Sequence, residues 1–231
     1  AAGVPVPEGR TVSSADDAWD AAEDIGLPVA VKPSDGNHAR GVSLNLKTRD
    51  EVVRAFAAAE QEGSEVIVER FIPGREHRLL VVGGKVVAAT RGEIIRVSGD
   101  GRSSIGQLID AHVNTDPRRG VEEHLPLETL RHDDPVLLLL LERQGLGIDS
   151  VLPRGESAEV QRTGNMSIDV TGQVHPDVAE LVAMATRVVG LDIAGIDLVA
   201  EDIGQPLIPQ GGAIVEVNAG PGLLMHLKPA I

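Results

Sequence analysis

The stretch GAIVEVNAGPGLLMH, residues 212–226, decides how the rest of the chain is interpreted. Glu216 and Asn218 alternate with apolar residues. A strand here would bury Val215 and Val217 on one face and present the polar pair on the other. The glycines and proline of AGPG follow at once and favour a turn that ends the strand. We therefore expect a carboxylate and an amide oxygen side by side at a strand end.

A second apolar stretch, GIDLV, lies roughly twenty residues earlier and contains Asp197. That separation suits two adjacent strands, and strand ends are where ligands bind in α/β proteins. Oxygen ligands that do not enclose a cation suit Mg²⁺, which takes further ligands from water and substrate phosphates. The sequence therefore predicts a magnesium site formed by Asp197, Glu216 and Asn218. The alternative is an edge strand whose polar residues are simply solvated.

The composition limits the possible functions. The chain has 231 residues, 42% of them hydrophobic, which is enough for one large domain or two lobes. A net charge of −14 and only three aromatic residues argue against nucleic-acid binding. The chain contains no cysteine, which excludes disulfides and thiolate zinc sites. The longest apolar run, residues 136–141, is far too short to span a membrane. We expect a cytoplasmic protein.

Hydrophobic periodicity and turn residues predict an α/β (α+β) chain with two lobes. In the first lobe, residues 1–72, we expect helices near 14–24 and 49–60 and strands at 27–32, 42–46 and 65–71. The second lobe, residues 73–231, should contain a hairpin around Gly83-Gly84, a mostly helical insertion at about 102–147, a helix at 176–189 and the two strands described above. Ile72-Pro73-Gly74 would act as a hinge.

Lys32 ends a predicted strand and precedes a glycine-bearing loop. An ammonium group and mobile backbone N–H groups suit phosphate binding. The loop residues proposed to cover the phosphates are Gly36, Asn37, His38, Arg40 and Gly41. This loop matches neither a Walker sequence nor a dinucleotide fingerprint, and a solvated hairpin tip is the alternative.

The junction of the two lobes offers a second set of contacts, because clefts between lobes often bind ligands. Backbone groups there could pair with an adenine edge, and the residues concerned are Glu69, Arg70, Phe71 and Ile72. Glu76 could accept hydrogen bonds from ribose hydroxyls. Arg78 and Arg91 flank the predicted hairpin turn and could hold carboxylate or phosphate oxygens. Exposed arginines on a strand are common, so each could also be an ordinary surface residue.

These segments resemble, in order, those of the ATP-grasp ligases over nearly the whole chain. The segments are LPVAVKPSDG, VIVERFIPGREHR, AGIDLV and AIVEVNAGPGL. The resemblance implies an ATP-grasp fold, with two α+β lobes gripping ATP, and an ATP-dependent carboxylate–amine ligation. Further motifs, among them EHRLLVVGGKVVAATR and VSGDGRSSIGQLID, resemble ligases that add aspartate to the C-terminus of a poly-aspartate chain through an acyl phosphate, releasing ADP and phosphate.

The resemblance also implies a role for each candidate residue. Lys32 and residues 36–41 would hold the phosphates of ATP, residues 69–72 its adenine and Glu76 its ribose. The Mg²⁺ would lie on the predicted trio of ligands. Arg78 and Arg91 would be the catalytic residues that steady the acyl phosphate and bind substrate, and Asn165 and Ser167 would also bind substrate. The substrates would be ATP, aspartate and a polymer primer, with neither nucleic acid nor membrane as partner.

Three departures from the family pattern affect these expectations. Ala39 stands where the family usually has a glycine, which stiffens the phosphate loop. The family has a glycine-rich stretch after Ser167 that this sequence lacks, either because the loop is deleted or because its residues were left out. Its loss would put substrate binding in doubt more than ATP binding. The family also has a preceding N-terminal domain and a following Mur-ligase-like domain, absent from this sequence, and we expect the full-length protein to form a homo-oligomer. The alternatives are a ligase that extends another chain, such as glutamate, and an ATP-binding scaffold without catalysis.

Overall fold

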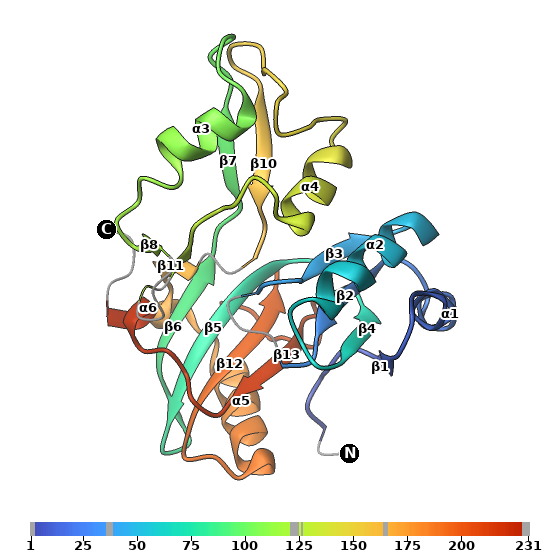
Figure 1. Cartoon of the computed structure of the whole chain (residues 1–231). Helices are drawn as coiled ribbons and strands as arrows, with labels where there is room; N and C mark the ends of the chain where they lie inside the picture. The colour runs from blue at the N-terminus through green and yellow to red at the C-terminus, as the bar shows by residue number, and fades with distance from the viewer. Residues whose placement is uncertain (1–2, 36–38, 121–124, 126, 164–165, 228–231) are drawn as a thin grey trace. The chain divides into compact units, whose positions relative to one another are not determined.

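The computed structural model describes residues 3–35, 39–120, 125, 127–163 and 166–227 (Figure 1). The chain divides into two compact units. Unit 1 combines residues 1–7, 72–93 and 166–231, and unit 2 combines residues 8–71 and 94–165. One boundary falls between Phe71 and Ile72, where the sequence predicts the hinge. The predicted lobes differ from this division at residues 1–7, 72 and 94–165, and their boundaries stay a prediction.

Unit 2 begins with a four-stranded antiparallel sheet in the order β1-β4-β2-β3, covered by two helices (Figure 1). The elements are β1 (Gly9–Val12), α1 (Ala15–Ile25), β2 (Val29–Pro33), β3 (Ser43–Leu46), α2 (Arg49–Glu60) and β4 (Val66–Arg70). Ser14 caps α1 as predicted, and Thr48 forms a capping box with Glu51 at the start of α2. Valine, alanine and leucine side chains from the sheet and both helices form the core.

The second part of unit 2 contains a two-stranded ribbon with α3 and α4 on either side of it (Figure 1). The elements are β7 (Ile95–Ser98), α3 (Ile105–His112), β8 (Arg119–Gly120), β9 (Leu127–Glu128), α4 (Pro135–Glu142) and β10 (Ser157–Gln161). Leu137 and Leu141 of α4 pack into the core of this part, whereas Leu139 packs into the core of β2–β4 and α2. One short helix therefore joins the two cores of unit 2.

Unit 1 is built on a five-stranded antiparallel sheet in the order β11-β6-β5-β12-β13. Its elements are β5 (Arg75–Val82), β6 (Lys85–Gly92), β11 (Met166–Asp169), η1 (Thr171–Gln173), α5 (Pro176–Val189), β12 (Ile193–Ala200), β13 (Ala213–Asn218) and α6 (Leu224–Leu227). Helix α5 packs against β5, β6, β12 and β13. Leu79, Ile196 and Leu198 are fully buried beneath it, so this face is the core and the opposite face is available for a site.

The predicted helix and strand types hold for most of the chain. Helix α5 occupies residues 176–189 as expected and ends at Gly190, which takes the left-handed conformation that glycine favours. In the predicted helical insertion, α3 and α4 are the helices, and the residues described between them form β8, β9 and irregular backbone. Among the described residues, no helix combines the length and apolar character that crossing a membrane requires.

Candidate active site

A row of polar side chains crosses the open face of the unit 1 sheet. Arg78 on β5 lies opposite Asp197 on β12, which lies opposite Glu216 on β13. On the other side of Arg78, Thr90 on β6 is its direct partner, and Asp169 on β11 is the partner of Thr90. Because directly paired residues of antiparallel strands point to the same face, these five side chains share one face.

The closest contacts in this row lie between Arg78 and Asp197. The Nε of Arg78 donates to Oδ1 of Asp197, and its Nη2 donates to Oδ2 at 2.7 Å. Asp197 is 3% exposed. Burial alone would lower the pKa of Arg78, but the charge and hydrogen bonds of Asp197 outweigh it and raise that pKa. The pair is therefore a fixed, charged anchor in which the guanidinium fork matches the carboxylate.

Gly195 creates the space that Arg78 occupies. A Cβ at Gly195 would lie 3.3 Å from Cδ and Nη1 of Arg78 and 2.8 Å from Cβ of Pro221. The strand thus needs a residue without a side chain here, on the same face as Asp197. The glycines after β13, which the sequence predicts to form a turn, are less constrained. A Cβ at Gly220 would meet no other described atom within 4 Å, whereas Gly195 is tightly enclosed.

The predicted magnesium ligands lie together on β12 and β13. Glu216 is the cross-strand partner of Asp197, and Nδ2 of Asn218 lies 3.2 Å from Oδ2 of Asp197. Two carboxylates and an amide oxygen form the hard donor set that Mg²⁺ prefers. The described residues contain no cluster of three His, Cys, Asp or Glu residues that could hold a metal. One of the three candidate ligands is an asparagine, which such a cluster does not include. The three residues present fit a magnesium ion that keeps other ligands from water or phosphate.

The predicted alternation along β13 is wrong at its start. Ile214 is 3% exposed and belongs to the core, while Val215 and Val217 are only half-buried. The register shifts between Glu216 and Ile214, because a β-bulge places one extra residue opposite the Asp197–Leu198 step. Ile214 and Glu216 can therefore face different environments although they are two residues apart. The polar face is preserved from residue 216 onwards.

Arg91 does not join Arg78 in the row. Its direct partner on β5 is His77, which is one residue away from Arg78 and therefore points to the opposite face. His77 is 1% exposed, and burial, with the charges of Arg91 and Arg75, lowers the pKa of its imidazole to about 4. Arg78 and Arg91, both predicted to hold carboxylate or phosphate oxygens, thus lie on different faces of the sheet at these positions.

In unit 2, Lys32 lies at the end of β2 as predicted. Its Nζ forms an ion pair of 2.9 Å with Oε1 of Glu69 on the neighbouring strand β4. The side chains are 18% and 13% exposed, so the ammonium group is held in place and not free in solvent. Gly36, Asn37 and His38 lie outside the described residues.

The described end of the loop predicted to cover the phosphates has two residues with a left-handed backbone. Ala39 has φ of 59° and Gly41 has φ of 70°. A Cβ at Gly41 would lie 3.1 Å from Cα of Ala59, at the end of α2, so the glycine allows a close approach. Nε of Arg40 lies 3.4 Å from Oε1 of Glu128 and 3.7 Å from Oε2 of Glu62. The loop is therefore tied to α2 and β9.

The proposed adenine segment uses part of its backbone within unit 2. The N–H of Arg70 donates to the carbonyl of Glu8, and that of Phe71 donates to the carbonyl of Pro28. An adenine contact would therefore need carbonyl groups or the N–H of Ile72, the first residue of the other unit. Glu76 is a half-buried residue of β5. Ser167 lies in β11 without a described side chain, and Asn165 lies outside the described residues.

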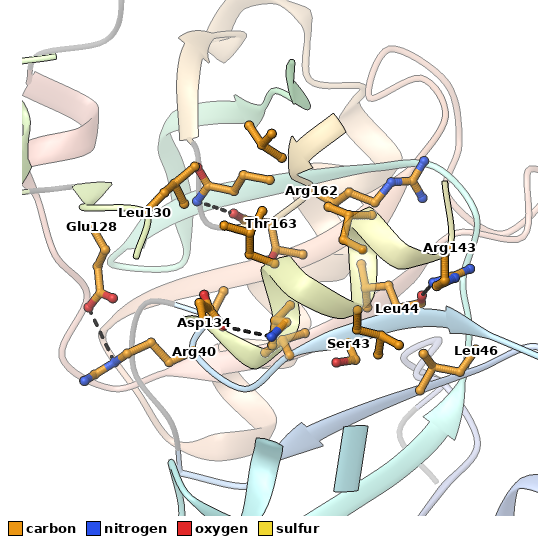
Figure 2. Close-up of a pocket in the computed structure, with 18 of the residues that line it drawn as sticks. Arg40, Ser43, Leu44, Leu46, Glu128, Leu130, Asp134, Arg143, Arg162 and Thr163 are labelled. Carbon is orange, nitrogen blue, oxygen red and sulfur yellow. Dashed lines mark hydrogen bonds and ion pairs between the residues drawn. The ribbon is translucent and has the colours of Figure 1, made fainter. Parts of the chain in front are cut away.

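A small cavity next to the phosphate loop was not predicted from the sequence. Its volume is about 90 Å³, and it lies between β3 and α4 (Figure 2). Its polar lining includes Arg40, Ser43, Glu128, Asp134 and Arg143. The lining residues come from three segments, 39–46, 128–143 and 160–163, that are far apart in the sequence, so no local motif could have indicated the cavity. Thr90 and His226 were also missed, because neither belongs to a recognisable spacing.

Comparisons with known proteins show which sequences and structures this chain is similar to. A family model described as the D-ala D-ala ligase C-terminus matches residues 1–101. Cyanophycin synthetase from Synechocystis sp. is 44% identical over 237 residues, which cover 99% of this chain and 27% of that protein. The cyanophycin synthetase from Trichormus variabilis is 42% identical over 100% of this chain and 26% of its own length. The chain thus spans about a quarter of the curated relatives it matches.

A second group of relatives acts in glutathione biosynthesis. A bifunctional glutathione biosynthesis protein from Streptococcus mutans is 32% identical over 97% of this chain and 31% of its own length. The crystal structure of a bifunctional glutathione synthetase from Pasteurella multocida superimposes with a TM-score of 0.55 and 28% identity, over 99% of this chain and 32% of that one. The chain therefore has an ATP-grasp fold and is similar, over nearly its whole length, to one segment of the cyanophycin synthetases.

Proposed function

We propose that this ATP-grasp domain joins a carboxylate to an amine at the expense of ATP, adding aspartate to the C-terminus of the poly-aspartate backbone of cyanophycin. The observation that supports it most directly is the row of Glu216, Asp197 and Arg78 with Asn218 beside it. Such a row places negative oxygen ligands next to a fixed guanidinium group. The similarity to cyanophycin synthetases favours aspartate as the amino acid.

Two chemical steps make up the proposed reaction. In the first, an oxygen of the C-terminal carboxylate of the poly-aspartate substrate attacks the γ-phosphorus of ATP, and the bond between that phosphorus and ADP breaks. In the second, the amino group of aspartate attacks the acyl carbon, the C–N bond forms, phosphate leaves and the amine loses a proton to water. Positioning and charge neutralisation supply the rate enhancement, since neither step needs a protein nucleophile.

Each candidate residue has a place in this proposal. Asp197, Glu216 and Asn218 would hold Mg²⁺, which supplies charge neutralisation for the phosphates when bound. Arg78 would neutralise the acyl phosphate from its fixed position beside Asp197. Arg91 stays a candidate for contacting substrate from the face of the sheet opposite Arg78. Asn165 and Ser167 stay candidates for binding the poly-aspartate substrate.

The nucleotide contacts are proposed for unit 2 and the start of unit 1. Lys32 and residues 36–41 would bind the phosphates, with Glu69 holding the ammonium group in position. Residues 69–72 would bind adenine and Glu76 the ribose. We further propose a cytoplasmic enzyme that takes aspartate and a polymer primer as substrates and forms a homo-oligomer.

Product analysis of the natural protein that contains this chain tests the proposal. With ATP, aspartate and an aspartate-rich primer, we expect ADP and phosphate, and hydroxylamine should trap the acyl phosphate. Glu216→Gln should abolish turnover, whereas Glu180→Gln, an exposed residue of α5, should not. AMP and pyrophosphate as products would contradict the acyl-phosphate mechanism. If the protein prefers glutamate, aspartate is the wrong amino-acid substrate. If it binds nucleotide but turns over no amino acid, it is an ATP-binding scaffold without catalysis.

A further inference from the structure

Two polar side chains on the open face of the unit 1 sheet have no hydrogen-bond partner among the described residues. They are Thr90, through its Oγ1, and His226, through both ring nitrogens. These atoms are buried, and Thr90 as a residue is 2% exposed. Leaving a buried polar atom unpaired costs about 1–3 kcal/mol, and native structures do so rarely. Two such groups close together indicate that something outside the chain completes them.

Their positions connect them to Arg78. Thr90 is the direct cross-strand partner of Arg78 on one side and of Asp169 on the other. His226 belongs to α6, which packs on β6 and β11 (Figure 1). The charges that act on its ring are those of Arg78, Asp169 and Asp197, the same row of residues. Thr90 and His226 therefore both lie near Arg78.

The two neighbouring carboxylates already accept hydrogen bonds within the chain. Asp197 is engaged by Arg78, and Oδ1 of Asp169 accepts a hydrogen bond of 2.8 Å from the N–H of Thr171. Burial, followed by the charge of Arg78, lowers the pKa of His226, so the ring is neutral near pH 7 and offers one N–H. A hydroxyl and an imidazole N–H next to a guanidinium form a group of hydrogen-bond donors. Such a group suits an anionic oxygen.

We propose that Thr90 and His226 form a subsite beside Arg78 that donates hydrogen bonds to an anionic oxygen of the substrate being activated. This subsite lies on the β6 side of Arg78, away from the proposed magnesium ligands on β12 and β13. The inference rests on the proposed function, because it assigns the subsite to that reaction. The oxygen belongs either to the carboxylate of the bound poly-aspartate substrate or to the acyl phosphate formed from it.

Paired substitutions in the natural protein test the subsite. Thr90→Val removes the hydroxyl at nearly constant shape, and Thr90→Ser restores it. His226→Leu removes both nitrogens, and His226→Gln keeps a donor. Thr186→Val is the matched control, because Thr186 is a buried threonine of α5 whose hydroxyl already donates to the carbonyl of Ala183 at 2.9 Å. Steady-state constants are measured for ATP, aspartate and an aspartate oligomer.

We expect Thr90→Val and His226→Leu each to lower kcat/KM for the oligomer by about tenfold, the equivalent of one hydrogen bond to a charged group. Thr90→Ser and His226→Gln should recover most of it, and the KM for ATP should stay unchanged. A rise in the KM of the oligomer alone assigns the carboxylate, and a fall in kcat alone assigns the acyl phosphate. If both deletions match Thr186→Val in every constant, the subsite does not exist.

A binding measurement separates this inference from the proposed function. The aspartate oligomer and inorganic phosphate are titrated calorimetrically into the wild type, Thr90→Val and His226→Leu, without ATP turnover. If the wild type ligates no amino acid yet binds either anion about tenfold more tightly than both variants, the subsite holds and the proposed function fails. Equal affinity in all three proteins for both anions overturns the subsite.

Discussion

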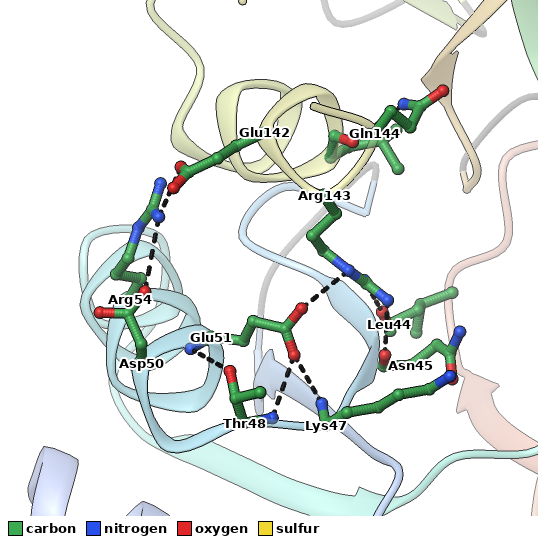
Figure 3. A network of polar contacts seen from close by, with 11 residues as sticks. Leu44, Asn45, Lys47, Thr48, Asp50, Glu51, Arg54, Glu142, Arg143 and Gln144 are labelled. Carbon is green, nitrogen blue, oxygen red and sulfur yellow. Dashed lines mark hydrogen bonds and ion pairs between the residues drawn. The ribbon is translucent and has the colours of Figure 1, made fainter. Parts of the chain in front are cut away.

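Arg143 and Arg78 are both partly buried guanidinium groups that hold a carboxylate, but their surroundings differ. Arg143 binds Glu51 through Nε at 3.0 Å and the carbonyls of Leu44 and Asn45 through Nη1 and Nη2 at 2.7 Å and 2.6 Å (Figure 3). All three nitrogens of that guanidinium group therefore have partners within the chain. Arg78 has Asp197, and next to it lie two groups that lack partners among the described residues.

The difference separates a structural charge from a functional one. Glu51 also accepts from the N–H groups of Lys47 and Thr48 at 2.6 Å and 3.1 Å, so the network around Arg143 is complete without any ligand (Figure 3). A fully satisfied polar network rigidifies the elements it joins, here β3, α2 and α4. The row around Arg78 is incomplete, which is expected where substrate supplies the remaining partners.

Removing Arg78 should have the largest effect. Arg78→Ala takes away the guanidinium group proposed beside the acyl phosphate, so we expect a loss in rate on the order of 10²-fold or more. It also leaves Asp197 buried without its cation, which should cost about 3–5 kcal/mol of unfolding free energy. Rate and urea unfolding are measured together.

Two variants sharpen this result. Arg78→Lys keeps the charge but loses the fork, and should restore more stability than rate. Arg91→Ala tests the opposite face of the same sheet. If Arg91→Ala reduces the rate as much as Arg78→Ala while leaving the unfolding free energy unchanged, the two arginines act on one substrate, and the comparison between faces is wrong.

His77 is a buried polar group on the core face of the unit 1 sheet, opposite the face that carries Arg78. Its Nδ1 has no partner among the described residues, and the charges around it are Arg75, Arg91 and Asp202. Its folded pKa of about 4 lies below the ordinary value of 6.5, so the unfolded chain binds more protons between these values. The contribution to stability is complete above pH 6.5 and is lost as the pH falls towards 4.

The expected loss is roughly 3 kcal/mol of unfolding free energy across that window, at about 1.4 kcal/mol per pKa unit. Urea unfolding at pH 7.5, 5.5 and 4.5 measures it. His77→Gln cannot titrate and should flatten this part of the profile. An unchanged slope in His77→Gln would assign the acid sensitivity to other groups.

Breaking the complete network should affect stability more than chemistry. Arg143→Ala leaves Oε1 of Glu51 and two carbonyls without their donor, so we expect a loss of about 2 kcal/mol. Amide exchange in residues 39–48 should also rise, because Arg143 holds the carbonyls at the end of β3. Exchange measured by mass spectrometry gives this directly.

Arg54→Ala is the matched control for Arg143→Ala. Arg54 joins the same two helices through Glu142, at 2.6 Å, but its partner is 62% exposed, and such pairs contribute about 0.5 kcal/mol or less (Figure 3). Equal losses in the two variants would show that the ion pairs, and not the carbonyl contacts, hold α4 against α2.

The sequence predicted the fold through features that act locally. Ser14 and Gly190 fix helix ends by capping, and the alternation along β12 and β13 places Asp197 and Glu216 on one face. The family motifs then supplied the order of the segments. What could not be predicted depends on register and on contacts distant in sequence. Strand alignment determines the bulge in β13, the pairing of Arg91 with His77 and the position of Thr90 beside Arg78. The spacing of residues in the sequence does not indicate this alignment.

Ala39 offers the smallest and most specific test, in the loop that the network around Arg143 supports. Its φ of 59° lies in the left-handed region, where a Cβ costs about 1–2 kcal/mol and glycine costs nothing. The structure thus gives a physical reason for the glycine usual at this position in the family. Ala39→Gly should raise the unfolding free energy, but the gain should be only about 0.5–1 kcal/mol, because glycine also frees the unfolded chain. Ala58→Gly, inside α2, should instead lower stability by about 1 kcal/mol. A loss of stability in Ala39→Gly would mean that its neighbours, and not its own backbone, hold residue 39 in this conformation.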